Sequence, residues 1–464
     1  MKEKNSFSGS IGFVLAAAGS AVGVGNIWRF PYLCAKDGGG LFLLVYLVLV
    51  LTFGFVLLTT DVAIGRKTKK NALKAFGALK KRWGFLGYLT FLVPTLIMTY
   101  YSVIGGWITK YFVSYVVSDG SALAEDGYFT SFITSKVAPI VFMLIFLALT
   151  AWIVYRGVEK GIEKFSSFIM PGLIVLILVI AVFSLTLSHT DADDTVRTGM
   201  QGLMVYLKPD FTGLTVKRFL EILLDAMSQL FFSLSVSMGI MVTYGSYVKD
   251  DVNLSKAMNQ IELFDTGVAV LAGMMIIPAV FAFSGGDPDT LQAGPALMFI
   301  TIPKVFASMG LGTVVGVLFF VLVLFAAVTS SIALTESAVS TFEDELGWDR
   351  KKATVLVGVI MVALGTLSSL GYGPLAGVTV IGMQFLDFFD FLTNSVMMPI
   401  AAIATCLLVS RVIGVDKIEQ EVELDGQPFR RKRIFRFMIR WLCPVFAAVI
   451  LASSVANAFG IIKM

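Results

Sequence analysis

Polar residues stand inside three long apolar stretches of this 464-residue sequence. The first stretch, AAAGSAVGVGNIWRFP, holds Asn26 and Arg29 just after three closely spaced glycines. A charged residue in such a segment costs about 2.5–3.5 kcal/mol on insertion scales and usually marks a functional site. The small-xxx-small spacing of Gly19 and Gly23 would by itself indicate only close helix packing, but packing does not account for the asparagine and the arginine.

The other two stretches carry hydroxyl groups. Ser233, Ser235 and Ser237 alternate with apolar residues in SQLFFSLSVSMGIMVTY, and Thr329 and Ser330 are adjacent in AAVTSSIAL. A regular helix would spread the three serines around its axis, whereas a non-helical stretch would gather them differently. In a lone helix Thr329 and Ser330 would bond to carbonyls of their own helix. Facing the interrupted first stretch, they would suit a hard cation, which prefers oxygen ligands.

Composition indicates that transmembrane helices position these groups. Hydrophobic residues make up 57% of the chain and charged residues only 15%, and the mean hydropathy is +0.84. Soluble domains have about 45–50% and about 25% of these classes, so an ordinary cytosolic enzyme and a disordered chain are excluded. We predict an all-α polytopic membrane protein with about eleven transmembrane helices, near residues 11–34, 41–64, 86–112, 138–155, 166–187, 219–246, 260–283, 310–342, 354–372, 375–410 and 437–460.

Basic residues predict how the chain crosses the bilayer. The connection GRKTKKNALKAFGALKKRWG holds eight Lys/Arg and no acid, and six more basic residues lie between Arg430 and Arg440. If the segments alternate, both connections fall on one side and the acidic loops near 118–127 and 191–194 fall on the other. The positive-inside rule then predicts an integral protein of the cell (plasma) membrane, with the N-terminus in the cytoplasm and the C-terminus outside.

The start of the chain has an alternative interpretation. Lys2 and Lys4 followed by IGFVLAAAGSA resemble a signal peptide with a small-residue cleavage site. The apolar pattern continues to Leu33, however, which favours a first transmembrane helix.

Residues that would bind a metal or a redox cofactor are scarce. Cys34, Cys406 and Cys443 are far apart in apolar stretches, which indicates buried thiols rather than a disulfide, and His189 is the single histidine. We therefore predict no cofactor, and without a basic tail or arm we predict no nucleic acid partner.

The interrupted segments are the first and the sixth. This placement is typical of transporters built from two five-helix inverted repeats with unwound first and sixth helices. We predict one transmembrane domain over 1–464, with repeats at about 11–187 and 219–410 and an additional helix at about 437–460. Sequence identity between the two halves is not evident, so this prediction rests on position.

Five motifs carry a resemblance that covers essentially the whole chain. GSAVGVGNIWRFPY, RGVEKGIEKF followed by MP, SLSVSMG, TSSIAL and FEDEL occur in this order. The sequence resembles the neurotransmitter:sodium symporter family, especially its bacterial amino-acid transporters. Many members have a twelfth helix that the predicted segments lack, which leaves any dimer contact through the last helices, and the oligomeric state, open.

The resemblance implies two sodium sites as the places of the coupling ions. Carbonyl groups freed by unwound backbone would supply part of each site. One site would comprise Gly19, Val22, Ala326, Thr329 and Ser330. The other would comprise Ala21, Asn26, Ser233, Asp265 and the carboxylate of the substrate.

The resemblance also implies a substrate site between the same helices. Amide groups of Val24 and Gly25 and the hydroxyl of Tyr101 would hold a carboxylate, as half-helix amino ends can. The carbonyls of Ala21, Phe232 and Ser233 and the hydroxyl of Ser235 would hold an amine.

Gly23 and the side-chain pocket define the expected substrate. Monoamine transporters of the family have an aspartate where this chain has Gly23, so the glycine implies a substrate that brings its own carboxylate. The pocket for its side chain carries no charge and contains a flexible methionine. It would be lined by Ile97, Phe232, Met238, Ser330 and Leu334, which implies a neutral, hydrophobic or aromatic amino acid.

Asp265 stands where many relatives have asparagine and where chloride-dependent members bind chloride close by. Tyr46, Gln229 and Ser233 match other chloride ligands of the family. Our hypothesis is that the Asp265 carboxylate replaces the chloride charge, ligates sodium and takes a proton on the return step. An ordinary buried carboxylate is the simpler alternative.

The gates of the family also have counterparts. Arg29 and Asp390 would approach one another on the extracellular side, unless they only snorkel and cap a helix. Asp344 would pair with Lys4 on the cytoplasmic side, where relatives have arginine. Gly161 and Pro171 fit a spacing associated with unwinding of the fifth helix, although Pro171 alone could simply begin a helix.

These residues together imply sodium-coupled uptake of an amino acid by alternating access, without chloride, and no enzyme activity. A channel would require a symmetric pore lining or a carbonyl ring, and no repeated filter motif is present. A membrane enzyme would require a base near Thr329 or Ser330, and none is evident. A substrate sensor of the same fold would share the binding residues, so only flux distinguishes it from a transporter.

Overall fold

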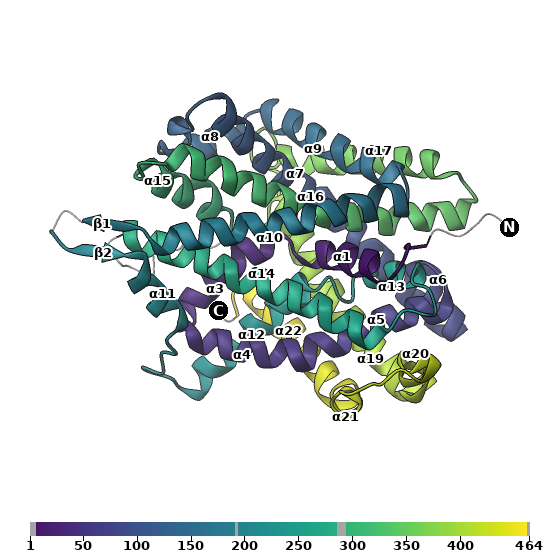
Figure 1. Cartoon of the computed structure of the whole chain (residues 1–464). Coiled ribbons are helices and arrows are strands. Elements are labelled where there is room, and N and C mark those ends of the chain that lie inside the picture. Colours follow the sequence, from purple (N-terminus) through teal and green to yellow (C-terminus); the bar gives the residue numbers. More distant parts are fainter. Residues whose placement is uncertain (1–5, 191–193, 285–293, 462–464) are drawn as a thin grey trace.

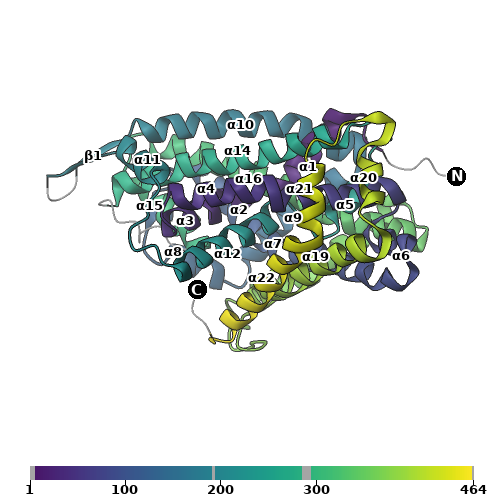
Figure 2. The same ribbon diagram turned by 90° about the horizontal axis from the view of Figure 1, so that it is seen from below.

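The computed structural model describes residues 6–190, 194–284 and 294–461. Its long helices lie side by side in one bundle, seen from two directions in Figures 1 and 2. Within these ranges nine helical spans are long and apolar enough to cross a membrane. They are Gly40–Thr68 (α4, η1, α5), Lys81–Val117 (η2, α7), Ala138–Tyr155 (α9), Val158–Leu185 (η4, α10), Leu254–Phe283 (α14), Gly312–Leu346 (α16), Arg350–Leu370 (α17), Phe385–Ile413 (α18, η7, α19, η8) and Lys432–Ala458 (α21, η10, α22).

The two remaining predicted segments are broken helices. Ser10–Ala21 (α1) and Val24–Lys36 (α2, α3) meet at 61° and count as one bent span. The sixth segment consists of α12 (Val216–Ser233) and α13 (Ile240–Ser246), separated by residues 234–239. The polytopic all-α fold and the interruption of the first and sixth segments are therefore confirmed.

Local backbone geometry explains the first break. The α1 helix ends at Val22, whose ψ is 98°, and Gly23 is extended with φ −125° and ψ −173°. The Asn26 side chain accepts a hydrogen bond from the Gly23 amide at 3.1 Å. It thereby satisfies an amide that the broken helix leaves unpaired.

The second break has a different cause. Ser235, Ser237 and Gly239 all have positive φ, at 51°, 60° and 76°, a region that costs a non-glycine residue about 1–2 kcal/mol. A carboxylate in α5 offsets part of this cost, because Asp61 accepts a hydrogen bond from the Ser237 amide at 2.7 Å. Alternating left-handed residues thus replace the helix where the sequence alternates serine with apolar residues.

Close packing of α5 and α13 places that carboxylate. A Cβ on Gly65 would lie 2.0 Å from the Val242 carbonyl oxygen, and one on Gly245 would lie 2.4 Å from the Val62 carbonyl oxygen. Only glycine permits this approach, so the second half of the sixth segment lies directly on α5.

The connections gather at the two ends of the bundle. The basic connection that contains α6 (Ala72–Leu79) and the connection with α20 (Asp416–Val422) lie near the start of α1. The antiparallel hairpin of β1 (Ser188–Thr190) and β2 (Val196–Thr198), together with α8, α11 and α15, lies at the opposite end (Figure 1). The connections thus alternate between the two ends of the bundle; of the acidic loop predicted near 191–194, residues 191–193 lie outside the described residues, and the orientation in the membrane stays a prediction. Helices α8, α11 and α15 span Tyr128–Thr134, Gly199–Leu207 and Ile302–Ala307, respectively.

Two of the cysteines are not isolated. The α19 and α22 helices bring the buried thiols of Cys406 and Cys443 next to each other, although the sequence separates them widely. Both are free thiols, as is Cys34.

Candidate functional site

A cluster of polar side chains lies at the two helix breaks. The amide nitrogen of Asn26 is 2.8 Å from Asp265 Oδ1 and 3.0 Å from Ser233 Oγ. Ser233 Oγ in turn lies 2.7 and 2.9 Å from the two carboxylate oxygens of Asp265. The three side chains come from α2, α12 and α14 and are 0–1% exposed.

The charge of this cluster is not balanced by the protein. Asp265 receives hydrogen bonds from neutral donors, and no lysine or arginine in the described part of the chain forms an ion pair with it. A buried carboxylate is costly unless it is paired or coordinates a cation. The Ser233 hydroxyl lies beside it, and the Asn26 side chain carries an oxygen on its other side that accepts from the Gly23 amide, so the side chains of the cluster include the oxygen ligands that a hard cation such as sodium prefers.

A small cavity of about 30 Å³ adjoins the cluster. Its wall contains most of the residues predicted to bind the substrate, and it also contains Ser20 and Ile240, which the sequence did not single out. The predicted residues in this wall are Ala21, Gly23, Asn26, Ile97, Tyr101, Phe232, Ser235, Met238, Ser330 and Leu334.

Gly23 is essential to the shape of this cavity. A Cβ there would lie 2.9 Å from Ser330 Oγ and 3.5 Å from the Tyr101 hydroxyl. Gly25 is covered by the Phe232 ring, since its Cβ would lie 2.7 Å from ring carbon Cδ1. Val24 lines the larger cavity described below.

The residues predicted for the sodium site that contains Thr329 and Ser330 also lie close together. Ser330 Oγ donates to the carbonyl oxygens of Ser20 and Val22, at 3.2 and 3.3 Å. Thr329 Oγ1 lies 3.1 Å from the Ala326 carbonyl oxygen within α16. A Cβ on Gly19 would lie 3.2 Å from the Thr329 Cβ, so this part of α1 faces the two hydroxyls.

A vestibule of about 580 Å³ lies on the other side of two aromatic residues. Tyr101 and Phe232 line both this vestibule and the small cavity, so they separate the two spaces. The end of α22, from Ile450 to Ala458, forms part of the vestibule wall.

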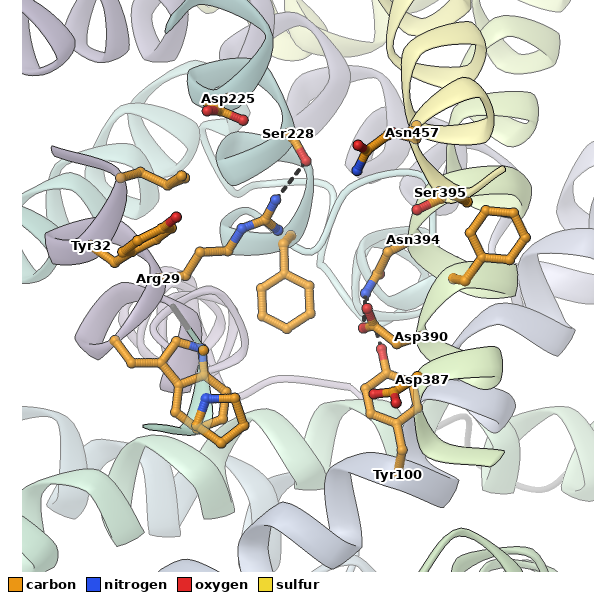
Figure 3. A pocket seen from close by; sticks show the side chains of 18 of the residues that line it. Arg29, Tyr32, Tyr100, Asp225, Ser228, Asp387, Asp390, Asn394, Ser395 and Asn457 are labelled. Atoms are coloured by element: carbon orange, nitrogen blue, oxygen red, sulfur yellow. Dashed lines mark hydrogen bonds between the residues drawn. The ribbon is translucent and has the colours of Figure 1, made fainter. Parts of the chain in front are cut away.

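The expected extracellular gate is unpaired in this conformation. Figure 3 shows Arg29 and Asp390 on opposite walls of the vestibule. Arg29 donates to Ser228 Oγ at 2.8 Å, and Asp390 accepts from Asn394 at 2.6 Å. The two gate residues thus face the same space, and each is hydrogen-bonded on its own wall.

Three bridges join α3 (Arg29–Lys36) to α12. The first is the Arg29–Ser228 hydrogen bond, and the second is the ion pair of Lys36 with Asp225 at 2.9 Å. In the third, Arg218 pairs with Asp37, directly after α3, at 2.9 Å and donates to the Lys36 carbonyl oxygen at 2.6 Å. These bridges hold together the outer halves of the two broken segments.

The expected cytoplasmic gate is only partly visible, because Lys4 lies outside the described residues. Its proposed partner Asp344 accepts a hydrogen bond from Asn71 at 2.8 Å. Phe7 is buried against the rings of Phe13, Tyr244 and Tyr247. The start of the first segment is thereby packed against α13 and the residue that follows it.

A buried charge network nearby was not anticipated. The guanidinium of Arg350 contacts both carboxylate oxygens of Glu336, which is fully buried, and Tyr247 donates to the same carboxylate at 2.8 Å. Arg350 lies on α17 and Glu336 on α16, and Tyr247 directly follows α13. FEDEL drew attention to the end of α16, but nothing in the sequence pairs Glu336 with an arginine on the next helix.

Asp61 is another buried charged residue that sequence reasoning missed, and it holds the break of the sixth segment. The signal that could have revealed it is a carboxylate inside the apolar run FVLLTTDVAIG, which is costly unless partnered. Gly161 lies in the π-helix η4 (Val158–Glu163) and Pro171 lies inside α10, so the fifth segment is helical throughout in this conformation.

Comparisons with known proteins agree with this geometry. The model of the Sodium:neurotransmitter symporter family matches residues 4–121 and 131–461. The sodium-dependent transporter YhdH of Bacillus subtilis (strain 168) is 34% identical over 98% of both chains. The human sodium- and chloride-dependent taurine transporter is 25% identical over 91% of this chain and 73% of its own length. The crystal structure of MhsT in complex with L-phenylalanine superposes on this chain with a TM-score of 0.84 and 35% sequence identity. The match covers 97% of this chain and 100% of the MhsT chain.

The apolar helical spans and the matched family, which is one of transporters and not of enzymes, define an integral membrane transporter. The chain belongs to the sodium:neurotransmitter symporter family, which confirms the resemblance seen in its motifs. Membership in this sodium-dependent family makes sodium its coupling ion and a small molecule its substrate.

Proposed function

We propose that the protein takes up a neutral, hydrophobic or aromatic amino acid together with sodium, by alternating access and without chloride. The observation that carries this proposal is the buried carboxylate of Asp265, which contacts Asn26 and Ser233 and has no basic partner within the described ranges. A sodium ion between Asp265 and the substrate carboxylate would offset part of their combined negative charge. A chloride ion at the same place would face a fixed negative charge.

The wall of the small cavity supports an amino acid with an apolar side chain. It contains the apolar side chains of Ile97, Met238 and Leu334 together with the hydroxyls of Ser235 and Ser330. The similar MhsT structure holds L-phenylalanine. Gly23 leaves space for a carboxylate that the substrate itself supplies.

The two predicted sodium sites would supply the energy for uptake. Each sodium ion that crosses ~100 mV contributes about 2.3 kcal/mol. Two ions with a zwitterionic substrate would therefore support about three decades of accumulation, at ~1.4 kcal/mol per decade. In the predicted orientation, with the N-terminus in the cytoplasm of the cell, the vestibule opens to the outside.

Uptake into proteoliposomes tests the proposal. Radiolabelled leucine, phenylalanine and tryptophan are offered with sodium or potassium outside, and with chloride or gluconate as the anion. We expect concentrative uptake that requires sodium and persists in gluconate. Sodium-dependent binding without uptake would instead identify a sensor, and uptake that requires chloride would refute the role given to Asp265.

A further inference from the structure

Half of the basic residues between 430 and 440 are neutralised within the protein. Arg431 pairs with Glu262 at 2.7 Å, and Lys432 pairs with Glu423 at 2.8 Å. Arg436 lies 2.5 Å from Glu419. Burial raises the pKa of Glu419, but the hydrogen bond and charge of Arg436 lower it by more, so this pKa lies below its usual value. These contacts fix α20 against α21.

The other three cations face outward. Arg430, Arg433 and Arg440 are exposed, and none has an ion pair or side-chain hydrogen bond to another described residue. A fourth cation approaches from the neighbouring span, because the guanidinium of Arg411 lies 5.2 Å from the centre of the Trp441 ring. Arg411 belongs to η8 (Leu408–Ile413) and Trp441 to η10 (Met438–Leu442).

These cations stand at the end of an apolar strip. Every fourth residue from 437 is exposed: Phe437 by 56%, Trp441 by 56%, Val445 by 55% and Val449 by 45%. Residues with this spacing share one face of a helix. The helical span Lys432–Ala458 lies at the surface of the bundle, beside α19 (Figure 2), so this face looks outward into the bilayer.

We propose that Arg411 and Arg440, with Trp441 between the two spans, bind the headgroup of an anionic phospholipid whose acyl chain lies along the strip below. Arginine binds phosphate oxygens with paired donors, tryptophan favours the membrane interface, and basic pockets between transmembrane helices bind anionic headgroups. This surface lies toward the end of the bundle that carries the basic connections, whereas the vestibule contacts the same span from Ile450 to Ala458, and the proposal does not depend on the proposed substrate.

The neutralised residues strengthen this assignment. The acids of α20 pair with Lys432 and Arg436 on the inward side of the helix, and they leave Arg433 and Arg440 without partners on the outer side. A surface that served only for solubility or for topology would not require this separation. Charge complementarity therefore favours a lipid phosphate over a second protein chain, whose surface would have to supply the missing acids.

Native mass spectrometry of the full-length protein tests the proposal by counting lipids bound in detergent. The probes are dioleoyl phosphatidylglycerol and dioleoyl phosphatidylcholine. The test variant is Arg411→Gln/Arg440→Gln. The control variant Lys80→Gln/Arg82→Gln removes two exposed cations from the basic connection at the same end of the bundle.

We expect the wild type and the control to retain the anionic lipid at concentrations within twofold of each other. The test variant should require about 25-fold more, since each basic residue near the surface contributes about fivefold. An equal loss in the control, or equal retention of both lipids by the wild type, would overturn the proposal. Displacement of the lipid by excess inorganic phosphate would also overturn it, because the site would then bind simple anions rather than a lipid. A change in dimer mass instead of lipid number would assign the surface to a second copy of the chain.

Discussion

Replacement of Asp265 by asparagine isolates the charge of the buried cluster. Asparagine has nearly the same shape, and its oxygen can still accept from Asn26, as Asp265 Oδ1 does at 2.8 Å. The hydroxyl of Ser233 can donate to that oxygen and accept from the new amide. The hydrogen bonds therefore survive in Asp265→Asn, and only the negative charge is lost.

The expected magnitude follows from that charge. A unit charge about 4 Å from sodium contributes about 4 kcal/mol at an effective dielectric constant of about 20. The neutral amide retains part of this as a dipole, so we expect a loss of about 2–4 kcal/mol. This corresponds to a half-saturating sodium concentration about 30- to 1000-fold higher in gluconate.

The decisive measurement compares sodium titrations in the presence and in the absence of chloride. Sodium-dependent binding of a labelled amino acid is titrated with sodium chloride and with sodium gluconate for the wild type and for Asp265→Asn. We expect the wild type to give the same curve in both salts and the variant to recover affinity in chloride. Asp61→Asn serves as the control, because that buried carboxylate binds the Ser237 amide and not the ion cluster. A variant whose sodium curve matches the wild type in gluconate, or ignores chloride, would refute the reasoning.

Three further changes probe separate parts of the protein. Gly23→Ala places a methyl group 2.9 Å from Ser330 Oγ and should weaken amino-acid binding about tenfold; wild-type binding would remove Gly23 from the substrate site. Thr329→Val keeps the shape of the side chain but removes a predicted sodium ligand, so half-saturation by sodium should rise about tenfold, and an unchanged titration would contradict the assignment. Arg350→Gln leaves the buried Glu336 unpaired and should destabilise the protein by about 3–5 kcal/mol in thermal melting, whereas Arg350→Gln/Glu336→Gln should recover most of this loss; a double variant as unstable as the single one would argue against a buried ion pair.

The broken helices could be predicted because their cause is local. Three glycines precede Asn26, and serines alternate before Gly239, so composition alone weakens the helix at both places. The residues that surround the small cavity were predicted in large part from the family resemblance, which carries them over from the motifs, including Ile97 and Tyr101 of the third segment. At these positions the residue types themselves indicated the chemistry of the site.

The missed residues depend on packing between distant segments. The role of Asp61 arises only because Gly65 lets α5 approach α13 closely enough for the carboxylate to reach the Ser237 amide. Glu336 and Arg350 are 14 positions apart and meet across α16 and α17. A one-dimensional pattern contains no signal for either contact, since each requires the crossing of two helices.

The gate depends on conformation rather than on sequence. Arg29 and Asp390 face the same vestibule, yet each is held by a neighbour on its own side. A sequence can identify two charges that are able to pair. It does not specify in which state of the transport cycle they do so.

The three bridges between α3 and α12 have a mechanical consequence. Separating the two half-helices would break all three bridges at once, whereas tilting them together breaks none. The two half-helices would therefore move as one rigid unit. Asn26 and Ser233 lie next to each other at the end of this unit that meets the helix breaks. Asp265 belongs to α14 and is not part of this rigid unit. Movement of this unit would therefore strain the hydrogen bonds that Asn26 and Ser233 make to Asp265, and a sodium ion bound among the three side chains, as we propose, would resist that movement.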